Sequence, residues 1–155
     1  MPFVLFVCTA NRYRSPIAAA VFSSKLGQDQ QTEDWKVDSA GTWTQNGLPV
    51  VPEAAQSAAQ KGLNLSTHRS KNITSDLIHQ ADLILVMENG QKEALEIEFP
   101  DCRKKIYLLS QATVGIPFDI PDPMIHPEAG DVSREILEMI SFNLDKLKLL
   151  AKRKV

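Results

Sequence analysis

Apolar residues along the chain follow two patterns, and the two patterns alternate. Short continuous apolar runs, rich in aromatic and β-branched residues, are typical of strands buried on both faces. Longer segments in which apolar residues recur every three or four positions are typical of helices. The expected strands are 3–7, 35–38, 82–87 and 105–109. The expected helices are 16–26, 52–61, 73–80, 89–99 and 131–152.

The first expected helix carries signals at both ends. Ser15 suits the N-cap, Pro16 suits the first helical position, and Gly27 suits the stop. Before the last helix, 111–130 forms a long connection that holds four of the nine prolines. Connections of that length inside a compact domain are often functional.

Alternation of strands and helices predicts an α/β fold. We expect a three-layer sandwich in which a four-stranded parallel sheet is flanked by helices, built as a single domain over 1–155. Ligands of such folds bind beyond the carboxyl ends of the strands. The segment after the first strand, 8–15, is therefore the first place to look for chemistry.

Composition narrows the class of protein. Seventeen Lys and Arg against nineteen Asp and Glu give a net charge of −2, so no nucleic-acid partner is expected. The longest apolar stretch, 1–7, is far shorter than the ~20 residues that span a bilayer, so no membrane partner is expected. No basic segment precedes this stretch, so no signal peptide is expected either. Two cysteines cannot form a disulfide framework, which favours a reducing cytoplasm.

Segment 8–15 reads CTANRYRS and combines three features of an anion site. A helix N-terminus presents unpaired N–H groups and the positive end of a dipole, which bind a dianion and stabilise the thiolate of Cys8. Arg14 offers a planar fork to two phosphate oxygens. The hydroxyl of Ser15 could donate to the thiolate or simply cap the helix. Singly, such a cysteine is usually a small buried hydrophobe and such an arginine usually faces solvent; together they predict an anion site with a nucleophile.

This segment resembles the signature of the low-molecular-weight protein tyrosine phosphatases. That signature is, in order, a cysteine, one further residue, a glycine, an asparagine, any residue, a second cysteine, an arginine and a serine. Further resemblances lie in 38–42 (DSAGT), 65–70 (LSTHRS), 81–87 (ADLILVM) and the late pair Asp122-Pro123. The landmarks stand in the family's order over nearly the whole chain.

The resemblance implies a role for each matching residue. Cys8 would attack phosphorus and become phosphocysteine, Arg14 would bind the equatorial oxygens, and Asp122 would protonate the leaving group. Asn11 would brace the loop, by a hydrogen bond to His68, and Ser15 would support it. The phosphate-binding residues would be Thr9, Ala10, Asn11, Arg12, Tyr13, Arg14 and Ser15. No cofactor is implied, and no metal is expected, because the three histidines are scattered along the chain.

The sequence departs from the family at the rim of the expected pocket. Ala10 replaces the loop glycine, so a positive φ there would strain the backbone. Tyr13 replaces the second cysteine, and Arg12 stands where members carry a small or apolar residue. Met124 and Ile125 replace a pair that is often tyrosine. The expected pocket wall is Arg12, Trp43, Met124 and Ile125.

Alternatives to these roles and to this function stay open. Asp119 competes with Asp122 as the acid, although Pro123 favours an extended Asp122 that projects its carboxylate. The expected substrate is a tyrosine-phosphorylated protein. A pseudo-phosphatase that binds phosphorylated or acidic partners is the main alternative. A phosphoarginine phosphatase is disfavoured by the charge of Arg12, and a thiol-linked arsenate reductase lacks cysteines, since only Cys102 is left.

Overall fold

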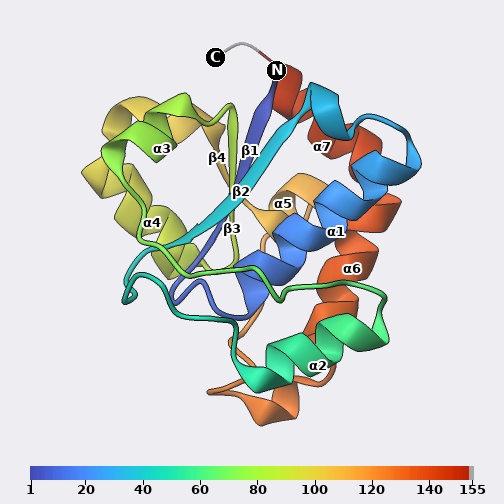
Figure 1. Cartoon of the computed structure of the whole chain (residues 1–155). Coiled ribbons are helices and arrows are strands. Elements are labelled where there is room, and N and C mark those ends of the chain that lie inside the picture. The colour runs from blue at the N-terminus through green and yellow to red at the C-terminus, as the bar shows by residue number, and fades with distance from the viewer. Residues whose placement is uncertain (154–155) are drawn as a thin grey trace.

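Four parallel strands form the centre of the molecule (Figure 1). A computed structural model describes residues 1–153. The strands are β1 Phe3–Cys8, β2 Lys36–Gly41, β3 Leu83–Val86 and β4 Ile106–Leu108. Their order in the sheet is β2-β1-β3-β4, and all three pairings are parallel. The predicted α/β sandwich with a four-stranded parallel sheet is confirmed.

Helices cover both faces of this sheet (Figure 1). One face carries α1 Arg14–Gln28, α5 Leu109–Thr113, α6 Val132–Phe142 and α7 Leu144–Lys152. The other face carries α3 Ser75–Gln80 and α4 Asn89–Glu98. Helix α2, Pro52–Gln60, packs on α1 and α6 at the carboxyl end of the sheet. Residues 1–153 also contain three short 3-10 helices: η1 Thr32–Asp34, η2 Pro100–Lys105 and η3 Pro127–Ala129. No helix in residues 1–153 is long and apolar enough to cross a membrane.

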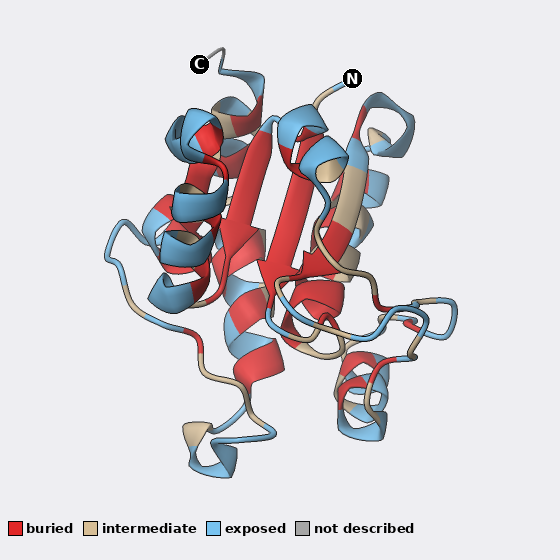
Figure 2. Cartoon of the chain, turned by 90° about the vertical axis from the view of Figure 1, so that its left-hand side faces the viewer, coloured by how far each residue is buried: buried red, intermediate tan, exposed pale blue. Residues whose placement is uncertain are grey.

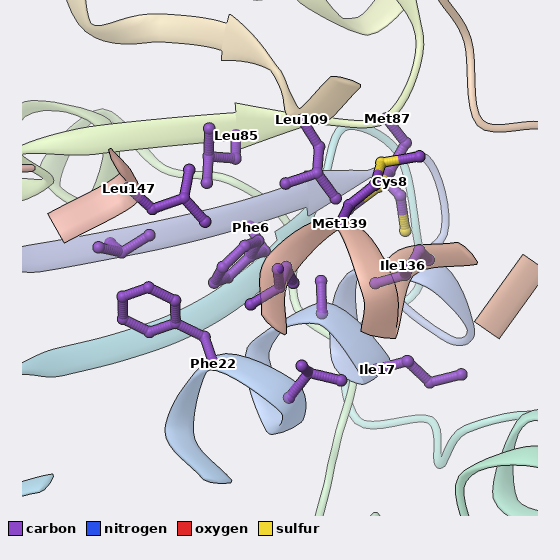
Figure 3. Close-up of a cluster of buried hydrophobic side chains, with 14 of the residues drawn as sticks. Phe6, Cys8, Ile17, Phe22, Leu85, Met87, Leu109, Ile136, Met139 and Leu147 are labelled. Atoms are coloured by element: carbon purple, nitrogen blue, oxygen red, sulfur yellow. The ribbon is translucent and has the colours of Figure 1, made fainter. Parts of the chain in front are cut away.

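Alternating side chains of the strands divide the core into two layers. On β1, Phe6 and Cys8 face α1 and α6, whereas Leu5 and Val7 face α3 and α4. Figure 2 shows the strands buried along their central length, and Figure 3 shows Cys8 at the end of the layer that contains Phe6 and Phe22. Burial on both faces explains why the strands read as continuous apolar runs. Cys8 is consequently the last core residue before the chain reaches the open edge of the sheet.

Helix α1 begins one residue before the predicted N-cap. Tyr13 is the N-cap and makes no side-chain capping bond, and Arg14 is the first helical residue. Of the two roles expected for the Ser15 hydroxyl, the N-cap is wrong and the contact with the Cys8 sulfur is present. The Ser15 hydroxyl is engaged by Cys8 and Asn11 instead, inside the loop.

The predicted helix 131–152 is two helices. Asn143 interrupts it with φ −129° and ψ 24°. Its side-chain Nδ2 donates to the Met139 carbonyl oxygen at 2.8 Å. Asparagine competes in this way for backbone partners, which is why it disfavours helix interiors. Apolar residues recur on one side of both helices without interruption, so the sequence pattern does not reveal the break between them.

The long connection before α6 returns across the carboxyl edge of the sheet. Ser110 holds it through two bonds to the Phe118 backbone, one donated by its hydroxyl and one accepted. The Ile120 N–H then donates to the Met87 carbonyl oxygen at 2.8 Å. These ties hold 118–120 at the carboxyl ends of β3 and β4, and Asp122 and Met124, which follow, line the cavity at Cys8.

Candidate active site

The thiol of Cys8 lies at the start of the β1–α1 loop, against a serine hydroxyl. Cys8 Sγ is 3.0 Å from Ser15 Oγ. The same Ser15 oxygen accepts a hydrogen bond from Asn11 Nδ2 at 2.9 Å. Because that bond occupies a lone pair and not the hydroxyl proton, Ser15 can donate its proton to the sulfur. A hydrogen bond donated to sulfur stabilises the thiolate form.

Asn11 is the residue that shapes the loop. Its φ is 57°, in the left-handed region, while Ala10 is absent from the positive-φ residues. The strain expected at Ala10 is thus avoided, since asparagine tolerates this region better than other residues. Asn11 is fully buried, and its side chain also donates to Ser39 Oγ at 2.9 Å and accepts from the Lys71 N–H at 3.1 Å.

His68 supports the loop through the backbone and not through the Asn11 side chain. Its Nε2 lies 2.7 Å from the Asn11 carbonyl oxygen, which can only accept, so Nε2 carries a proton. The expected hydrogen bond between these two residues is present, with the Asn11 backbone carbonyl as acceptor. Burial lowers the pKa of His68, an effect opposed by the bond to Asn11 and reinforced by the charge of Lys71. Neutral His68 in the Nε2–H tautomer is the form that this environment favours.

The loop leaves its backbone donors free. Within residues 1–153, the N–H groups of residues 10–15 donate no hydrogen bond to another backbone or side-chain group. Asn11, Arg14 and Ser15 are buried residues, and the other three are partly buried. Buried N–H groups are nearly always paired, so a run of unpaired ones next to a thiol indicates a site for an anion.

In the part of the chain that the structure describes, the hydrogen bonds that fix the Arg14 guanidinium all come from its Nη1 nitrogen. Its Nη1 donates to Glu88 Oε2 at 2.5 Å and to the Ile120 carbonyl oxygen at 2.9 Å. Its side chain is 3% exposed. The Nε and Nη2 donors remain for a ligand, and Nη2 lies 3.9 Å from Asp122 Oδ2. The guanidinium is thereby held with its other edge open, which suits bidentate binding of two phosphate oxygens.

Glu88 and Gln91 are parts of the site that the sequence did not reveal. Glu88 is the N-cap of α4, and Gln91 Oε1 accepts from the Glu88 N–H at 3.0 Å. Gln91 Nε2 donates to Thr9 Oγ1 at 3.0 Å, so this buried amide links the partner of Arg14 to the loop. A Glu-x-x-Gln spacing after the third strand is readable as a capping box. Nothing in that spacing indicates contact with a loop about 80 residues earlier.

Gly41, at the end of β2, permits the close approach of the loop. A Cβ at this position would lie 2.5 Å from the Thr9 carbonyl oxygen and 3.3 Å from the Ala10 carbonyl carbon. The same Thr9 oxygen accepts from the Trp43 N–H at 3.0 Å. A residue with a side chain at Gly41 would push the loop away from the sheet.

Asp122 faces the site, and Asp119 does not. Asp122 Oδ1 accepts from the Met124 N–H at 2.9 Å, which leaves Oδ2 directed at Arg14. Asp119 Oδ1 accepts from the Asn89 N–H at the start of α4 and is not a wall of the cavity at Cys8. Of the two candidate acids, only Asp122 is positioned beside the thiol.

A cavity of about 200 Å³ opens over Cys8. Its walls combine polar groups with the apolar surfaces of Ala10, Tyr13, Val51 and Met124. Arg12 lies at the rim, where its Nε donates to the Pro49 carbonyl oxygen at 2.8 Å. Trp43 and Ile125, expected as walls, lie outside this cavity and are 80% and 69% exposed.

Tyr13 packs, partly buried, against the core layer that contains Cys8. Burial raises the pKa of its phenol, a hydrogen bond from Ser57 lowers it, and the charge of Asp131 raises it further. Tyr13 is consequently neutral and forms part of the cavity wall.

Cys102 lies in η2, in the core layer on the other face of the sheet from Cys8, and both cysteines are free.

The chain is similar to known phosphatases over nearly its full length. A family profile described as low molecular weight phosphotyrosine protein phosphatase matches residues 3–155. A probable low molecular weight protein-tyrosine-phosphatase EpsP from Ralstonia nicotianae is 33% identical over 142 residues, which cover 92% of this chain and 90% of that protein. A protein-arginine-phosphatase from Geobacillus stearothermophilus is 34% identical over 142 residues, which cover 90% of this chain and 92% of that protein. The crystal structure of a low molecular weight protein tyrosine phosphatase from T. tengcongensis has a TM-score of 0.83 at 31% identity, with coverage of 96% of this chain and 99% of that one.

The fold, the loop and these similarities together define a cysteine-dependent protein phosphatase. Within that class, the chain belongs to the low molecular weight phosphotyrosine protein phosphatase family.

Proposed function

We propose that the protein removes phosphate from phosphotyrosine in protein substrates, through a phosphocysteine at Cys8. The observation that supports this most is the run of unpaired N–H groups at 10–15 around a thiol that a serine hydroxyl stabilises. Such a loop binds the three equatorial oxygens of a phosphoryl group, whose charge must be stabilised in the transition state. Arg14 adds two donors, from Nε and Nη2, on the open edge of its guanidinium.

The reaction then proceeds in two displacements. The Cys8 thiolate attacks phosphorus, the bond to the tyrosyl oxygen breaks, and the Asp122 carboxyl group gives that oxygen a proton. In the second step the Asp122 carboxylate takes a proton from water, which attacks phosphorus and releases inorganic phosphate. The thiolate leaves in this step, and the Ser15 hydroxyl, 3.0 Å from Sγ, stabilises it. Cys8 must stay a free thiol for this cycle, and a reducing compartment such as the cytoplasm maintains one.

The cavity walls favour an aromatic substrate. Tyr13, Val51 and Met124 present apolar surface on which a phenyl ring can pack. Phosphoarginine is the second candidate, because relatives of comparable identity are protein-arginine-phosphatases. Arg12 at the rim places a like charge near an incoming guanidinium group, which disfavours that substrate.

Substrate choice is tested by comparing three peptides that differ only in the phosphorylated residue. We expect kcat/KM to be highest for the phosphotyrosyl peptide, lower for the phosphoarginyl peptide and lowest for the phosphoseryl peptide. Arg12→Gln removes the charge and should raise the phosphoarginyl to phosphotyrosyl ratio by roughly 3–10-fold, corresponding to ~1 kcal/mol of screened repulsion. Arg103→Gln makes the same substitution at an exposed arginine of η2, away from the cavity, and is the matched control.

A phosphoarginyl peptide that is turned over faster than the phosphotyrosyl peptide would contradict the proposed substrate. Absence of Cys8-dependent turnover on all three would favour a pseudo-phosphatase that only binds phosphorylated partners.

Oxidation of Cys8 should be irreversible, because no second thiol lies close to it. Tyr13 stands at the loop position of a second cysteine, and Cys102 lies on the opposite face of the sheet. A disulfide needs Cα atoms within about 7 Å, so peroxide should take Cys8 through sulfenic acid to sulfinic or sulfonic acid. Activity after peroxide removal and dithiothreitol treatment, with intact mass in parallel, is the measurement. Cys102→Ala should behave identically, and full recovery with a mass loss of two hydrogens would show an intramolecular disulfide instead.

A further inference from the structure

Three side chains with metal-binding atoms meet at the amino edge of the sheet, far from the phosphatase loop. His79 lies in the last turn of α3, and Asp101 and Cys102 lie in η2. The His79 ring nitrogens, the Asp101 carboxylate and Cys102 Sγ offer one ligand atom each, and the three atoms lie within 4.8 Å of one another. His79 Nε2 is 2.8 Å from Asp101 Oδ2. The fold therefore assembles a nitrogen, an oxygen and a sulfur ligand from segments that are separate in the sequence.

This set of atoms has the chemistry of a zinc site. Zinc prefers imidazole nitrogen, thiolate sulfur and carboxylate oxygen in tetrahedral geometry. Bond lengths of about 2.0–2.3 Å then place the ligand atoms ~3.3–3.8 Å apart, within about 1 Å of the present spacing. The His79 and Asp101 side chains are 45% and 66% exposed, so both can make such a shift. One thiolate and one carboxylate also balance the charge of a divalent cation.

The imidazole of His79 is held in the orientation that a ligand requires. Its Nδ1 lies 2.7 Å from the Ser75 carbonyl oxygen, so Nδ1 carries a proton, and its Nε2 shares a second proton with Asp101 Oδ2 at 2.8 Å, which a cation would displace. Metal-binding histidines usually donate their second nitrogen to a carbonyl or carboxylate in this way. The ring also packs edge-on against Phe99, with centroids 6.0 Å apart.

The cluster opens on a cavity of about 690 Å³, which gives a cation an entry path and leaves room for a water molecule as fourth ligand. Lys105 lines the same cavity. Its ammonium group donates to the carbonyl oxygens of His79 at 3.0 Å and Ala81 at 2.6 Å, so backbone oxygens satisfy it.

We propose that His79, Asp101 and Cys102 form a zinc-binding site, with water as the fourth ligand. Binding releases two protons to solvent, one from the Cys102 thiol and one from the hydrogen bond between His79 Nε2 and Asp101, and the ion joins α3 to η2. These two elements lead into β3 and β4, so the bound ion should stabilise the fold at this edge of the sheet. The site is separate from the chemistry at Cys8.

Cobalt is the probe for this site because a thiolate ligand gives Co²⁺ a charge-transfer band in the near ultraviolet. The chain has two cysteines, so Cys102 is the only thiol in Cys8→Ser. Titration of Cys8→Ser with Co²⁺ should produce that band together with the visible bands of a tetrahedral ion, and added Zn²⁺ should abolish both. Equilibrium dialysis should find about one zinc ion per chain.

Variants of the three ligands, made in the Cys8→Ser background, distinguish a zinc site from a simple ion pair between His79 and Asp101. Adding Cys102→Ala should remove the charge-transfer band, and adding His79→Gln or Asp101→Asn should weaken zinc affinity at least about tenfold. His126→Gln is the matched control, because this exposed histidine lies outside the cluster and should change nothing. Circular dichroism shows whether the variant with Cys102→Ala still folds, since Cys102 is buried. Asp101 is exposed, so Asp101→Asn tests the site without disturbing the core. Absence of the band in Cys8→Ser, or its persistence in the variant without Cys102, would overturn the proposal.

Discussion

Replacing Cys8 with serine is expected to abolish turnover while phosphate and vanadate still bind. The hydroxyl of serine is a far weaker nucleophile than a thiolate, so we expect kcat to fall by more than about 10⁴-fold. The loop donors at 10–15 and Arg14 are unchanged in this variant, so oxyanion binding should remain. Steady-state hydrolysis of an aryl phosphate and calorimetric titration with vanadate measure the two quantities. Turnover within tenfold of wild type would exclude Cys8 as the nucleophile.

Arg14→Ala should lose both turnover and oxyanion binding. Removal of a donor to a developing oxyanion costs roughly 10²–10³-fold, and this variant also leaves Glu88 without its partner. Because Cys8 and Arg14 serve one transition state, the double variant should be no worse than Cys8→Ser alone. Arg14→Lys keeps a charge beside Glu88 without the planar fork and controls for misfolding. Near wild-type kcat/KM in Arg14→Ala would remove the phosphate-loop assignment.

Asp122→Asn should slow the reaction by roughly 10²–10⁴-fold for ordinary phosphate esters, because asparagine cannot protonate the leaving oxygen. The loss should shrink for a leaving group that departs without a proton, so a series of aryl phosphates of graded acidity is the measurement. A slope of rate against leaving-group pKa that is steeper in the variant than in wild type is the expected signature.

Asp119→Asn is the matched control for the acid. Asp119 binds the Asn89 N–H at the start of α4 and does not face the thiol. We expect little change in kcat for this variant. Equal losses across the leaving-group series for Asp122→Asn would indicate a structural role, and a large loss confined to Asp119→Asn would transfer the assignment.

The strands and the reactive segment could be predicted because their signals are local. A strand buried on both faces must be apolar at every position, so β1 and β3 are visible as runs. The Cys8 to Ser15 segment is contiguous, and its residue types suit a strand-to-helix anion site without any distant contact. Helix ends were less predictable: Ser15 has the chemistry of an N-cap, yet its hydroxyl binds within the loop, between Cys8 and Asn11.

The sequence by itself determined the parallel α/β class and the segment that carries the thiol, because both follow from the spacing of neighbouring residues. The tertiary structure alone decided which distant groups complete each site. Glu88 reaches Arg14 because the parallel pairing of β1 and β3 brings their carboxyl ends together. Asp101 and Cys102 reach His79 because η2 and α3 lie at the opposite edge of the same sheet. Side-chain partners of this kind depend on strand order and register, which residue spacing along the chain does not encode.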